Sequence, residues 1–596
     1  MRGLIWACAV WAAGTACAAE PGEVRIGGAL GARFDLTLSN NVFRLDHEKD
    51  FYAPFRKKAS GPGLFVGYGK HADALVHFAK NSDDPRVAKL KDELIGFIID
   101  RQLPDGYTGC MRPESRMVAP WDMHDMGFII QALVADYAYF GNGKALEAAR
   151  RNADYMIANW DRLPDDWATS YVTDRMLTLG FTYGLERLFE LTGERKYLDF
   201  VLRERSLGVW NLPVVIGRGP MVYGHSYVYL STCFEQLELY RLHQRQQRYL
   251  KTSLGLLDFM VRGDGLLIDG TGGVCECWTD DQDGEGSIGE TCTVAYQLIF
   301  YDQLMRLGLA DPALLGDLSE RAIYNALFGA QSRDGRKIRY YTPLNGRRKF
   351  WGPDTYCCPN NFRRAVSRLP EYVFYADEDG ILANLYTDCR AELSAHGVKV
   401  GIREETAYPA DGRIVLTLTP ERPIAFTLKL RIPSWCAKAS AHVNGKPVTY
   451  RFGPGEMLAL PRTWKAGDRV ELELPMEVRT ILGRQRQAGR FAVMRGPVAY
   501  SLVLDSLKAV RGRDPLDAAT ALMMDPLSLR YENGCIKARV TTNDSAVGVS
   551  GARSTEAVLV PFSDEDVTLT YFRAPDLKRT VTAHDELLGG QVNCGL

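Results

Sequence analysis

Four residues in two short segments have the types and spacing of a metal site. Glu290 and Cys292 offer a carboxylate and a thiol, and the adjacent Cys357 and Cys358 offer two more thiols. Zinc commonly takes four ligands in a tetrahedral arrangement and binds cysteine sulfur and glutamate oxygen readily. These four side chains therefore form a candidate Cys3Glu zinc site.

Spacing alone leaves a simpler interpretation open, in which Cys357 and Cys358 form disulfides with distant cysteines or are merely buried thiols. A disulfide between the two neighbours is disfavoured, because the small ring strains the bond away from its normal geometry. Both segments lie where a loop is expected to enter a helix. The elements around them must therefore bring the two helix starts together.

The elements expected to do this are paired helices between residues 61 and 379. Apolar residues recur at i, i+3 and i+4 in the segments 126–139, 146–157, 177–191 and 227–242. Short polar turns link the segments into hairpins, and the turns recur along the chain as in a helical repeat. The Gly-rich and aromatic loops between them favour a closed (α/α)6 barrel, with its site at one mouth, over an open solenoid.

After residue 380 the pattern changes to short alternating or β-branched runs separated by Pro, Gly and Asn turns. This part is predicted to form β-sandwich domains, over 380–485 and 486–596. The barrel domain is expected over 19–379, with a short β segment at its start, since residues 24–45 have a strand-like composition. The predicted fold class is multidomain α plus β.

The N-terminus resembles a cleaved export signal over residues 1–18, with Arg2, a short apolar stretch and Ala16-Cys17-Ala18 as a cleavage site. A lipid-modified Cys17 is the less favoured alternative. The mature protein is thus expected in the periplasm or outside the cell. Removing Cys8 and Cys17 from the 13 cysteines leaves eleven, an odd number, so at least one sulfur is unpaired within the mature chain.

Composition excludes several classes of partner. The 596 residues carry a formal net charge of −1, and no long run of like charge interrupts them, so a nucleic-acid surface is not indicated. No stretch after the signal reaches the roughly 20 apolar residues that a membrane span requires. A neutral substrate is the simpler expectation.

The two cysteine segments, together with passages elsewhere, resemble glycoside hydrolase family 127, the DUF1680 group of β-L-arabinofuranosidases. Glu290-Thr291-Cys292 and Cys357-Cys358-Pro359-x-Asn361 are similar to the elements that hold zinc in that family. Further similar passages occur in family order: Asp105-Gly106-Tyr107, Gly224-His225, Thr271-Gly272-Gly273, Tyr341-Thr342-Pro343-Leu344, Asn384-Leu385-Tyr386, Arg431-Ile432-Pro433-Ser434-Trp435, Val443-Asn444-Gly445 and Arg495-Gly496-Pro497-Val498-Ala499-Tyr500.

The resemblance implies a role for each residue of the motif. Cys357 becomes the nucleophile, with Glu290, Cys292 and Cys358 as the other zinc ligands, and Glu276 becomes the general acid/base. A metal-bound thiol is a thiolate at neutral pH, so it could attack the anomeric carbon of a sugar. Hydrolysis of the glycosyl-cysteine by an activated water would then retain the anomeric configuration.

The acid/base residue has a rival in Glu285. Glu276 is favoured because it follows the Thr-Gly-Gly passage closely and has Trp278 nearby, an apolar neighbour that would raise the pKa of a carboxylic acid. Cys275 and Cys277, which flank Glu276, are interpreted as structural residues, with disulfides to other residues or a second metal as the alternatives. The acidic run over 280–283 lacks the glutamate of a calcium loop and is interpreted as a solvated loop near the site.

The family resemblance also implies that His124, His225 and Tyr341 bind the sugar, although a lone histidine is often only a core residue. A further family histidine is absent, and Thr173-Asp174-Arg175 stands in its place. Aromatic residues of the helical segments are interpreted as core rather than as a sugar platform; these are Tyr183, Phe189, Tyr227 and Tyr240.

These residues together predict a secreted, retaining exo-glycosidase that releases β-L-arabinofuranose from plant-derived glycans or glycoproteins. The change at residues 173–175 and the cysteines around Glu276 keep another unusual pectic sugar open as the substrate. A carbohydrate-binding protein with a purely structural zinc is an alternative of a different class, disfavoured by the presence of both Cys357 and Glu276. A polysaccharide lyase is a further alternative, but a lyase has no evident use for a zinc-thiolate cluster.

Overall fold

The computed structural model describes residues 22–60, 65–163, 178–214, 225–350, 352–503, 522–543, 552–564, 567–577 and 584–588. Three features singled out in the sequence lie outside the described residues. They are the predicted signal at 1–18, the lipidation alternative at Cys17, and the departure from the family pattern at Thr173-Asp174-Arg175.

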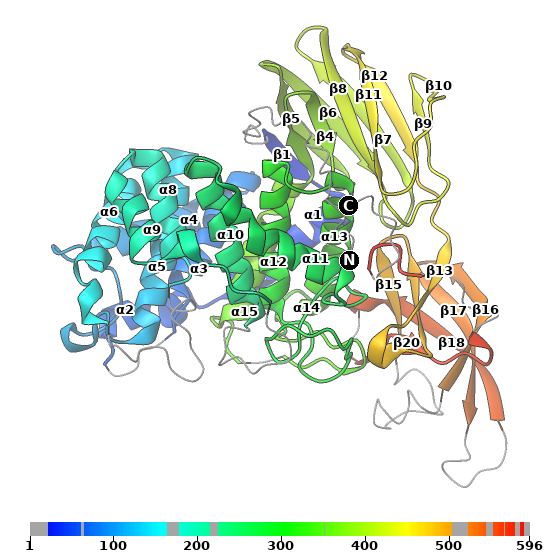
Figure 1. Cartoon of the computed structure of the whole chain (residues 1–596), viewed down its shortest axis with the longest axis horizontal. Helices are drawn as coiled ribbons and strands as arrows, with labels where there is room; N and C mark the ends of the chain where they lie inside the picture. The colour runs from blue at the N-terminus through cyan, green and yellow to red at the C-terminus, as the bar shows by residue number, and fades with distance from the viewer. Residues whose placement is uncertain are drawn as a thin grey trace, which may run out of the picture.

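A closed ring of helices forms the centre of the helical domain in the described part of the chain (Figure 1). Each helix of the ring packs against the next, and the last packs against the first. The ring consists of α3 (Tyr68–Asn81), α5 (Pro120–Phe140), α8 (Phe181–Thr192), α10 (Ser226–Leu242), α12 (Thr291–Leu307) and α15 (Cys357–Ser367).

An outer helix packs on each member of this ring. The outer helices are α4 (Pro85–Arg101), α6 (Gly143–Ala158), α9 (Arg195–Arg203), α11 (Lys251–Arg262), α13 (Pro312–Arg321) and α1 (Gly28–Leu36), which pairs with α15. The predicted (α/α)6 barrel is confirmed. Because an antiparallel outer helix separates successive inner helices, the inner helices run in one direction and begin at the same end of the barrel.

The burial pattern of each helix follows from its layer. In the outer helix α4 only one stripe is buried, Val87, Lys91, Leu94, Ile95 and Ile98, with the spacing of an amphipathic helix. In the inner helix α10 every residue from Ser226 to Tyr240 is buried, because neighbouring helices cover it on several sides. Many polar side chains of the inner helices are therefore held in the barrel core.

Two sheets pack beside the barrel as a sandwich (Figure 1). One has the order β1-β5-β6-β7-β12-β9-β10 and the other β11-β8-β4-β3. Their strands are β1 (Glu23–Ile26), β3 (Phe374–Ala376), β4 (Gly380–Ala383), β5 (Cys389–Ala395), β6 (Val398–Thr406), β7 (Arg413–Pro420), β8 (Ile424–Ile432), β9 (Ser440–Val443), β10 (Lys446–Pro447), β11 (Glu456–Trp464) and β12 (Asp468–Glu473). Burial alternates strictly along β5, as expected of a strand with one face on a core.

The strand expected over residues 24–45 is largely replaced by helix. Only Glu23–Ile26 forms a strand, and it pairs antiparallel with β5. Residues from Gly28 onward form α1 and then the helical turns Thr37–Asn41 and Val42–Arg44. The physical reason is the four-residue spacing of the buried Leu30, Phe34 and Leu38, which aligns them on one face of a helix.

A third sheet follows the sandwich and includes a strand from the barrel domain. Its main path is β13 (Val478–Leu482), β14 (Phe491–Arg495), β15 (Val498–Val503), β18 (Ala552–Pro561), β17 (Cys535–Asn543) and β16 (Leu522–Glu532), with β19 (Val567–Leu569) and β20 (Tyr571–Phe572) beside it. The short strand β2 (Gly346–Arg347) pairs with β19. The C-terminal sheet is thereby joined to the loop that precedes α15.

Buried ion pairs connect the barrel to the sheets. The fully buried Arg431 of β8 forms ion pairs with Asp317 and Glu320 of α13, the latter at 2.8 Å. Arg321, the next residue of α13, pairs with Asp585 at 2.8 Å. Charged groups buried in this way are stable only when paired, so these contacts fix how the sheets sit on the helices.

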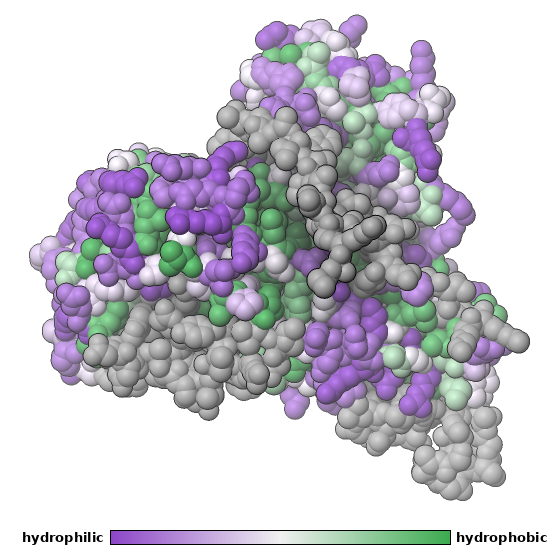
Figure 2. All heavy atoms as spheres, viewed as in Figure 1, coloured by the Kyte–Doolittle hydropathy of each residue, from purple (hydrophilic) through white to green (hydrophobic). Residues whose placement is uncertain are grey.

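The face of the molecule shown in Figure 2 is largely hydrophilic over the barrel and over the upper sandwich. Hydrophobic side chains are visible in the hollow between these two parts. Among the helices of the described ranges, none combines the length and the apolar composition that crossing a membrane requires.

Replacement of Arg431 by Met should destabilise the protein by about 3–5 kcal/mol, because it leaves the carboxylates of Asp317 and Glu320 buried without their cation. Urea unfolding followed by tryptophan fluorescence measures the change. Arg413→Met is the matched control, because Arg413 lies on the exposed side of β7 and its ion pairs are long, 3.6 and 3.9 Å. Equal stability of the two variants would contradict this account of the interface.

Candidate active site

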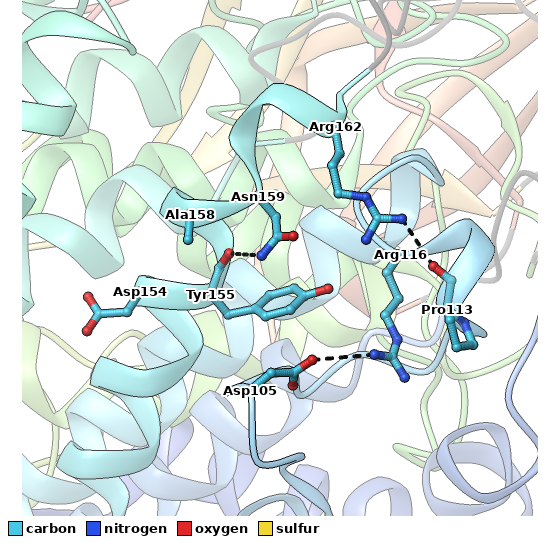
Figure 3. Close-up of a pocket in the computed structure, with 8 residues that line it drawn as sticks. All are labelled: Asp105, Pro113, Arg116, Asp154, Tyr155, Ala158, Asn159 and Arg162. Atoms are coloured by element: carbon cyan, nitrogen blue, oxygen red, sulfur yellow. Dashed lines mark hydrogen bonds and ion pairs between the residues drawn. The ribbon is translucent and has the colours of Figure 1, made fainter.

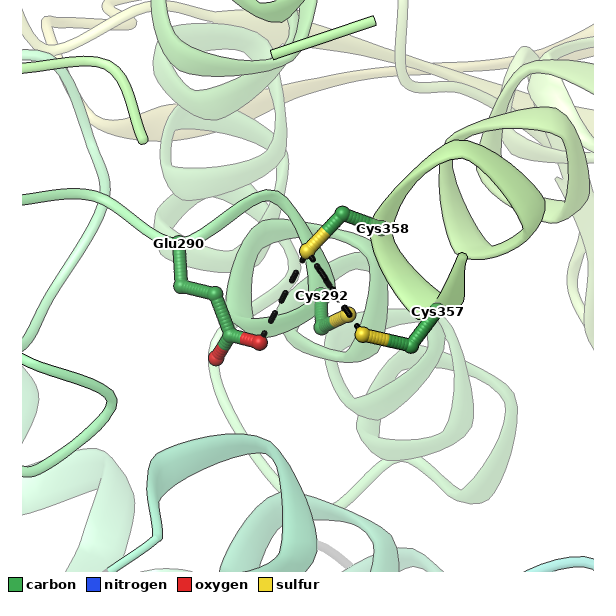
Figure 4. Close-up of side chains that lie close together, drawn as sticks. All are labelled: Glu290, Cys292, Cys357 and Cys358. Carbon is green, nitrogen blue, oxygen red and sulfur yellow. Dashed lines mark hydrogen bonds between the residues drawn. The ribbon is translucent and has the colours of Figure 1, made fainter. Parts of the chain in front are cut away.

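The four predicted metal ligands lie together at the start of two neighbouring inner helices (Figure 4). The ligand atoms of Glu290, Cys292, Cys357 and Cys358 all lie within 4.8 Å of one another. The Cys292 and Cys358 sulfurs are 3.2 Å apart, and the Cys358 sulfur lies 3.9 Å from that of Cys357 and 3.8 Å from Glu290 Oε1. The predicted set therefore converges from residues that are far apart in the sequence.

Local structure explains why both segments deliver their side chains to this point. Glu290 is the residue before the first turn of α12, and Cys292 lies within that turn. Cys357 and Cys358 are the first two residues of α15, and Pro359 follows them in the first turn, where the missing N–H of proline disrupts no helical hydrogen bond. Both helices thus present the positive end of their dipole to anionic ligands.

The backbone before α12 is held by the segment around Tyr340. The Thr291 N–H donates to the Tyr340 carbonyl at 2.9 Å, and the Thr291 hydroxyl donates to the Arg339 carbonyl at 2.8 Å. The Thr293 hydroxyl donates to Glu290 Oε2 at 3.0 Å, which orients the carboxylate. Glu290 is therefore positioned by its own helix and by a neighbouring loop.

The electrostatics of this group of donors suit a bound cation. Burial raises the pKa values of Glu290, Cys292 and Cys358 well above their usual ranges. The pKa of Cys357 is held well below its usual range by its hydrogen bonds with the Cys292 and Cys358 sulfurs. The group thus tolerates one ionised ligand. If all four ligands were ionised, they would repel one another unless a metal ion lay between them. Three thiolates and one carboxylate suit a soft divalent metal.

Glu276 belongs to a second group that shares Glu290 with the first, and the ligand atoms of His225, Glu276 and Glu290 fall within 4.8 Å of one another. The Tyr340 hydroxyl donates a hydrogen bond to Glu276 Oε1, and His225 Nε2 lies 3.4 Å from Oε2. Burial raises the pKa of Glu276, opposed by the hydrogen bond from Tyr340. A carboxyl that keeps its proton nearer neutral pH suits a general acid.

The backbone at Glu276 adopts a conformation that glycine normally occupies. Cys275 and Glu276 have φ values of 48° and 65°, between Val274 and Cys277, which exchange backbone hydrogen bonds of 2.9 and 3.0 Å. Positive φ at both central residues is typical of a type I′ turn, which favours Asn-Gly. The Ser226 N–H holds the turn by donating to the Glu276 carbonyl at 2.8 Å. Such strain is common where a functional side chain must point in one direction.

The predicted sugar-binding residues occupy different places. His225 precedes α10 and contacts Glu276, and burial lowers the pKa of His225 to about 3, so its ring is neutral. Tyr341 forms a β-bridge with Glu290 and a hydrogen bond with Glu276. His124 of α5 is buried against Phe65 and Phe128, with ring centroids 5.4 and 4.9 Å away. The structure thus brings His225 and Tyr341 to Glu276, and places His124 among neighbouring aromatic rings.

Three residues near the site were not connected with it from the sequence. Tyr340 donates to Glu276, although only its neighbour Tyr341 was singled out. Tyr227, interpreted as core, is buried but lies against His225, with ring centroids 4.4 Å apart. Lys70 is completely buried at the start of α3, and nothing in its spacing marked it. Tyr340 could have been predicted from its position next to Tyr341. The places of Tyr227 and Lys70, in contrast, depend on how the helices pack.

The loop before α12 narrows two alternatives that the sequence left open. Cys275 and Cys277 form no disulfide, and all ten cysteines of the described ranges have free thiols. Glu285, the rival acid/base, forms a β-bridge with Asn345 and is absent from both clusters of potential ligands in the described part of the chain. The acidic run is partly exposed, as expected of a solvated loop, and Arg486 pairs with Asp281 at 3.2 Å and with Asp283 at 2.9 Å.

An open cavity of about 470 Å³ lies at the C-terminal end of α6 (Figure 3). Because α5 and α6 form a hairpin, this is the end of the barrel at which the inner helices begin. Arg116 and Arg162 face it beside the Tyr155 ring (Figure 3). None of the predicted site residues lines it.

Substitutions at Cys275 should test the turn that presents Glu276. Cys275→Asn should leave stability unchanged or raise it by up to about 1 kcal/mol, because Asn tolerates a positive φ. Cys275→Val should lower stability by about 1–2 kcal/mol, because a β-branched side chain clashes in this conformation. Thermal unfolding measures both variants, and equal melting temperatures would show that the turn is not strained.

Comparisons with known proteins agree with these features. The sequence model of the β-L-arabinofuranosidase GH127 catalytic domain matches residues 55–371, and that of the GH127 middle domain matches residues 380–476. A non-reducing end β-L-arabinofuranosidase from Bifidobacterium longum subsp. longum is 26% identical over 487 residues, which cover 70% of this chain and 72% of the relative.

Solved structures show the same fold over nearly the whole chain. A GH127 β-L-arabinofuranosidase from Geobacillus stearothermophilus T6 has a TM-score of 0.75 at 20% identity, covering 93% of this chain and 100% of its own. A second structure, described as a GH127 β-arabinofuranosidase, has a TM-score of 0.77 at 22% identity, covering 95% and 99%. The family match extends over more than half of the chain, from the start of the barrel through its metal-ligand motifs. The chain therefore belongs to the GH127 β-L-arabinofuranosidase family of glycoside hydrolases.

Proposed function

We propose that this protein is a secreted, retaining exo-glycosidase that uses a zinc-bound Cys357 thiolate to release β-L-arabinofuranose from plant-derived glycans. The observation that carries the proposal is the pair of clusters joined by Glu290. One places Cys357 in a set of four metal-binding side chains, and the other places Glu276 beside His225. A nucleophile and an acid/base close to one small volume are what a double displacement requires.

Glu290, Cys292, Cys357 and Cys358 would hold the zinc ion. Zinc would keep the thiols deprotonated at neutral pH, which their burial otherwise opposes. The soft donor set favours zinc over magnesium or calcium, which prefer oxygen ligands.

In the first step, the Cys357 sulfur attacks the anomeric carbon. A carbon–sulfur bond forms as the carbon–oxygen bond to the leaving group breaks, and Glu276 transfers its proton to the departing oxygen. Tyr340 and His225 hold the Glu276 carboxyl for this transfer. The raised pKa of Glu276, caused by burial, favours the protonated form that the step needs.

In the second step, Glu276 accepts a proton from water, and the water oxygen attacks the same carbon. The carbon–sulfur bond breaks, and its electron pair returns to Cys357 as the thiolate. The two inversions together retain the anomeric configuration, as in retaining glycosidases that use a carboxylate nucleophile. Glu276 ends the cycle protonated, as it began.

The proposed sugar and the exo mode rest on the family and its relatives. The Bifidobacterium relative is named for action at a non-reducing end. Thr173-Asp174-Arg175, which replaces a histidine of the family, favours a second candidate, in which the same groups act on another unusual pectic sugar. Export to the periplasm or the medium rests on the signal expected over residues 1–18.

Cys357→Ala should lower kcat for a chromogenic β-L-arabinofuranoside by about 10⁴-fold or more, because no other group can form the covalent intermediate. Glu276→Gln should lower it by about 10²–10⁴-fold. Cys436→Ala and Glu285→Gln are the matched controls, since Cys436 is buried in the distant sandwich and Glu285 lies outside both clusters. Proton NMR of the first product formed should show the β anomer.

Full activity of Cys357→Ala would exclude the thiolate mechanism, whereas loss of activity in Glu285→Gln alone would move the acid/base role to Glu285. No hydrolysis by the wild type would exclude this sugar and favour the second candidate or a binding role.

The purified protein should contain about one zinc ion per chain, measured by inductively coupled plasma mass spectrometry after gel filtration. Cys292→Ala and Cys358→Ala should each lose most of the metal, because each removes one of the four ligands. Cys436→Ala should retain it. Equal zinc content in all the variants would show that the metal is bound elsewhere.

A further inference from the structure

Lys70, in the first turn of α3, has a completely buried ammonium group whose hydrogen-bonding capacity is unused. Its Nζ has no hydrogen-bond partner among the described residues. The nearby carboxylate of Asp125 accepts hydrogen bonds of 3.0 Å from the Val66 and Gly67 N–H groups instead. Burying an unpaired ammonium costs several kcal/mol, so its three N–H donors call for an acceptor that the chain itself does not supply.

Aromatic rings surround Lys70 and compensate only part of this cost. Its Nζ lies 4.5 Å from the ring centroid of Phe128, 5.5 Å from that of Phe65 and 5.7 Å from that of Tyr227. Cation–π contacts of this kind contribute about 0.5–2 kcal/mol each. The rings attract the positive charge, but they offer the N–H groups of Lys70 no oxygen atom as a hydrogen-bond acceptor.

The same rings connect Lys70 with the two histidines that the family resemblance singled out. Phe65 and Phe128 also pack on His124, at 5.4 and 4.9 Å, and Tyr227 packs on His225 at 4.4 Å. The thiols of Cys292 and Cys357 are close enough to act on the charge of Lys70. The unused donors therefore lie where the sugar must lie if Cys357 is to reach its anomeric carbon.

We propose that the Lys70 ammonium binds a ring or side-chain hydroxyl of the sugar that Cys357 attacks. This inference rests on the proposed function and deepens it, because it names a further residue that positions the sugar.

The test compares the wild type with Lys70→Met on a chromogenic β-L-arabinofuranoside and on its 2-, 3- and 5-deoxy analogues. Lys70→Met should lower kcat/KM for the parent sugar by about 100-fold, as expected when a buried polar contact is removed. For one of the three deoxy analogues, the kcat/KM of the wild type should be lower than that for the parent sugar by a similar factor. On that analogue, Lys70→Met should lower kcat/KM by less than about threefold relative to the wild type, because the hydroxyl that Lys70 would bind is already absent.

Equal losses for Lys70→Met on the parent sugar and on all three analogues would overturn the proposal, because a purely structural role affects every substrate alike. Lys80→Met is the matched control on the same helix, since the Lys80 ammonium is partly exposed and pairs with Glu371. It should leave kcat/KM for the parent sugar within about twofold of the wild type.

Lys70→Gln keeps a side-chain NH2 group that can donate a hydrogen bond, and it provides a second variant if Lys70→Met does not fold. It should retain more activity on the parent sugar than on the affected analogue, and the reverse order would overturn the proposal. Failure of the wild type to hydrolyse any of the four sugars would overturn the proposed function instead, and this inference with it.

Discussion

The crowding of four potential anions into one buried volume is the constraint on which this structure depends. Glu290, Cys292, Cys357 and Cys358 repel one another when ionised, and burial strengthens that repulsion. A shared metal ion would remove it, and the helix N-termini from which three of the four project reduce it further. With a metal bound, the geometry would keep a thiolate where a free cysteine would be protonated.

The barrel holds this crowded group in place through contacts deeper in its core. Arg364 lies about two turns below Cys357 on α15 and donates to Asp73 at 2.7 Å, to Gln131 at 3.1 Å and to Tyr296 at 3.2 Å. These partners belong to α3, α5 and α12, so a single guanidinium ties together the helices that carry the site. The C-terminal sheet contributes from outside, through Arg486 and the loop that bears Glu276.

Residue type and closeness in the chain explain how much of the site could be predicted from the sequence. The metal-binding residues were predictable because each pair lies within three positions of the chain and has an unusual chemical type. Glu276 was also singled out, and the structure places it beside His225 and Tyr340. Lys70 and Tyr227 could not be found in this way, because a lysine or a tyrosine in a helix has no distinguishing spacing.

The sequence by itself determined the helical hairpins, the β-rich half and the metal-binding residue types, because periodicity and side-chain chemistry are local properties. The tertiary structure alone decided that α1 completes the barrel, that Cys275 and Cys277 stay unpaired, and that Lys70 is buried without an acceptor. Each of these depends on which surfaces meet across hundreds of residues. Contacts at that separation are set by the packing of the whole chain, and no short segment encodes them.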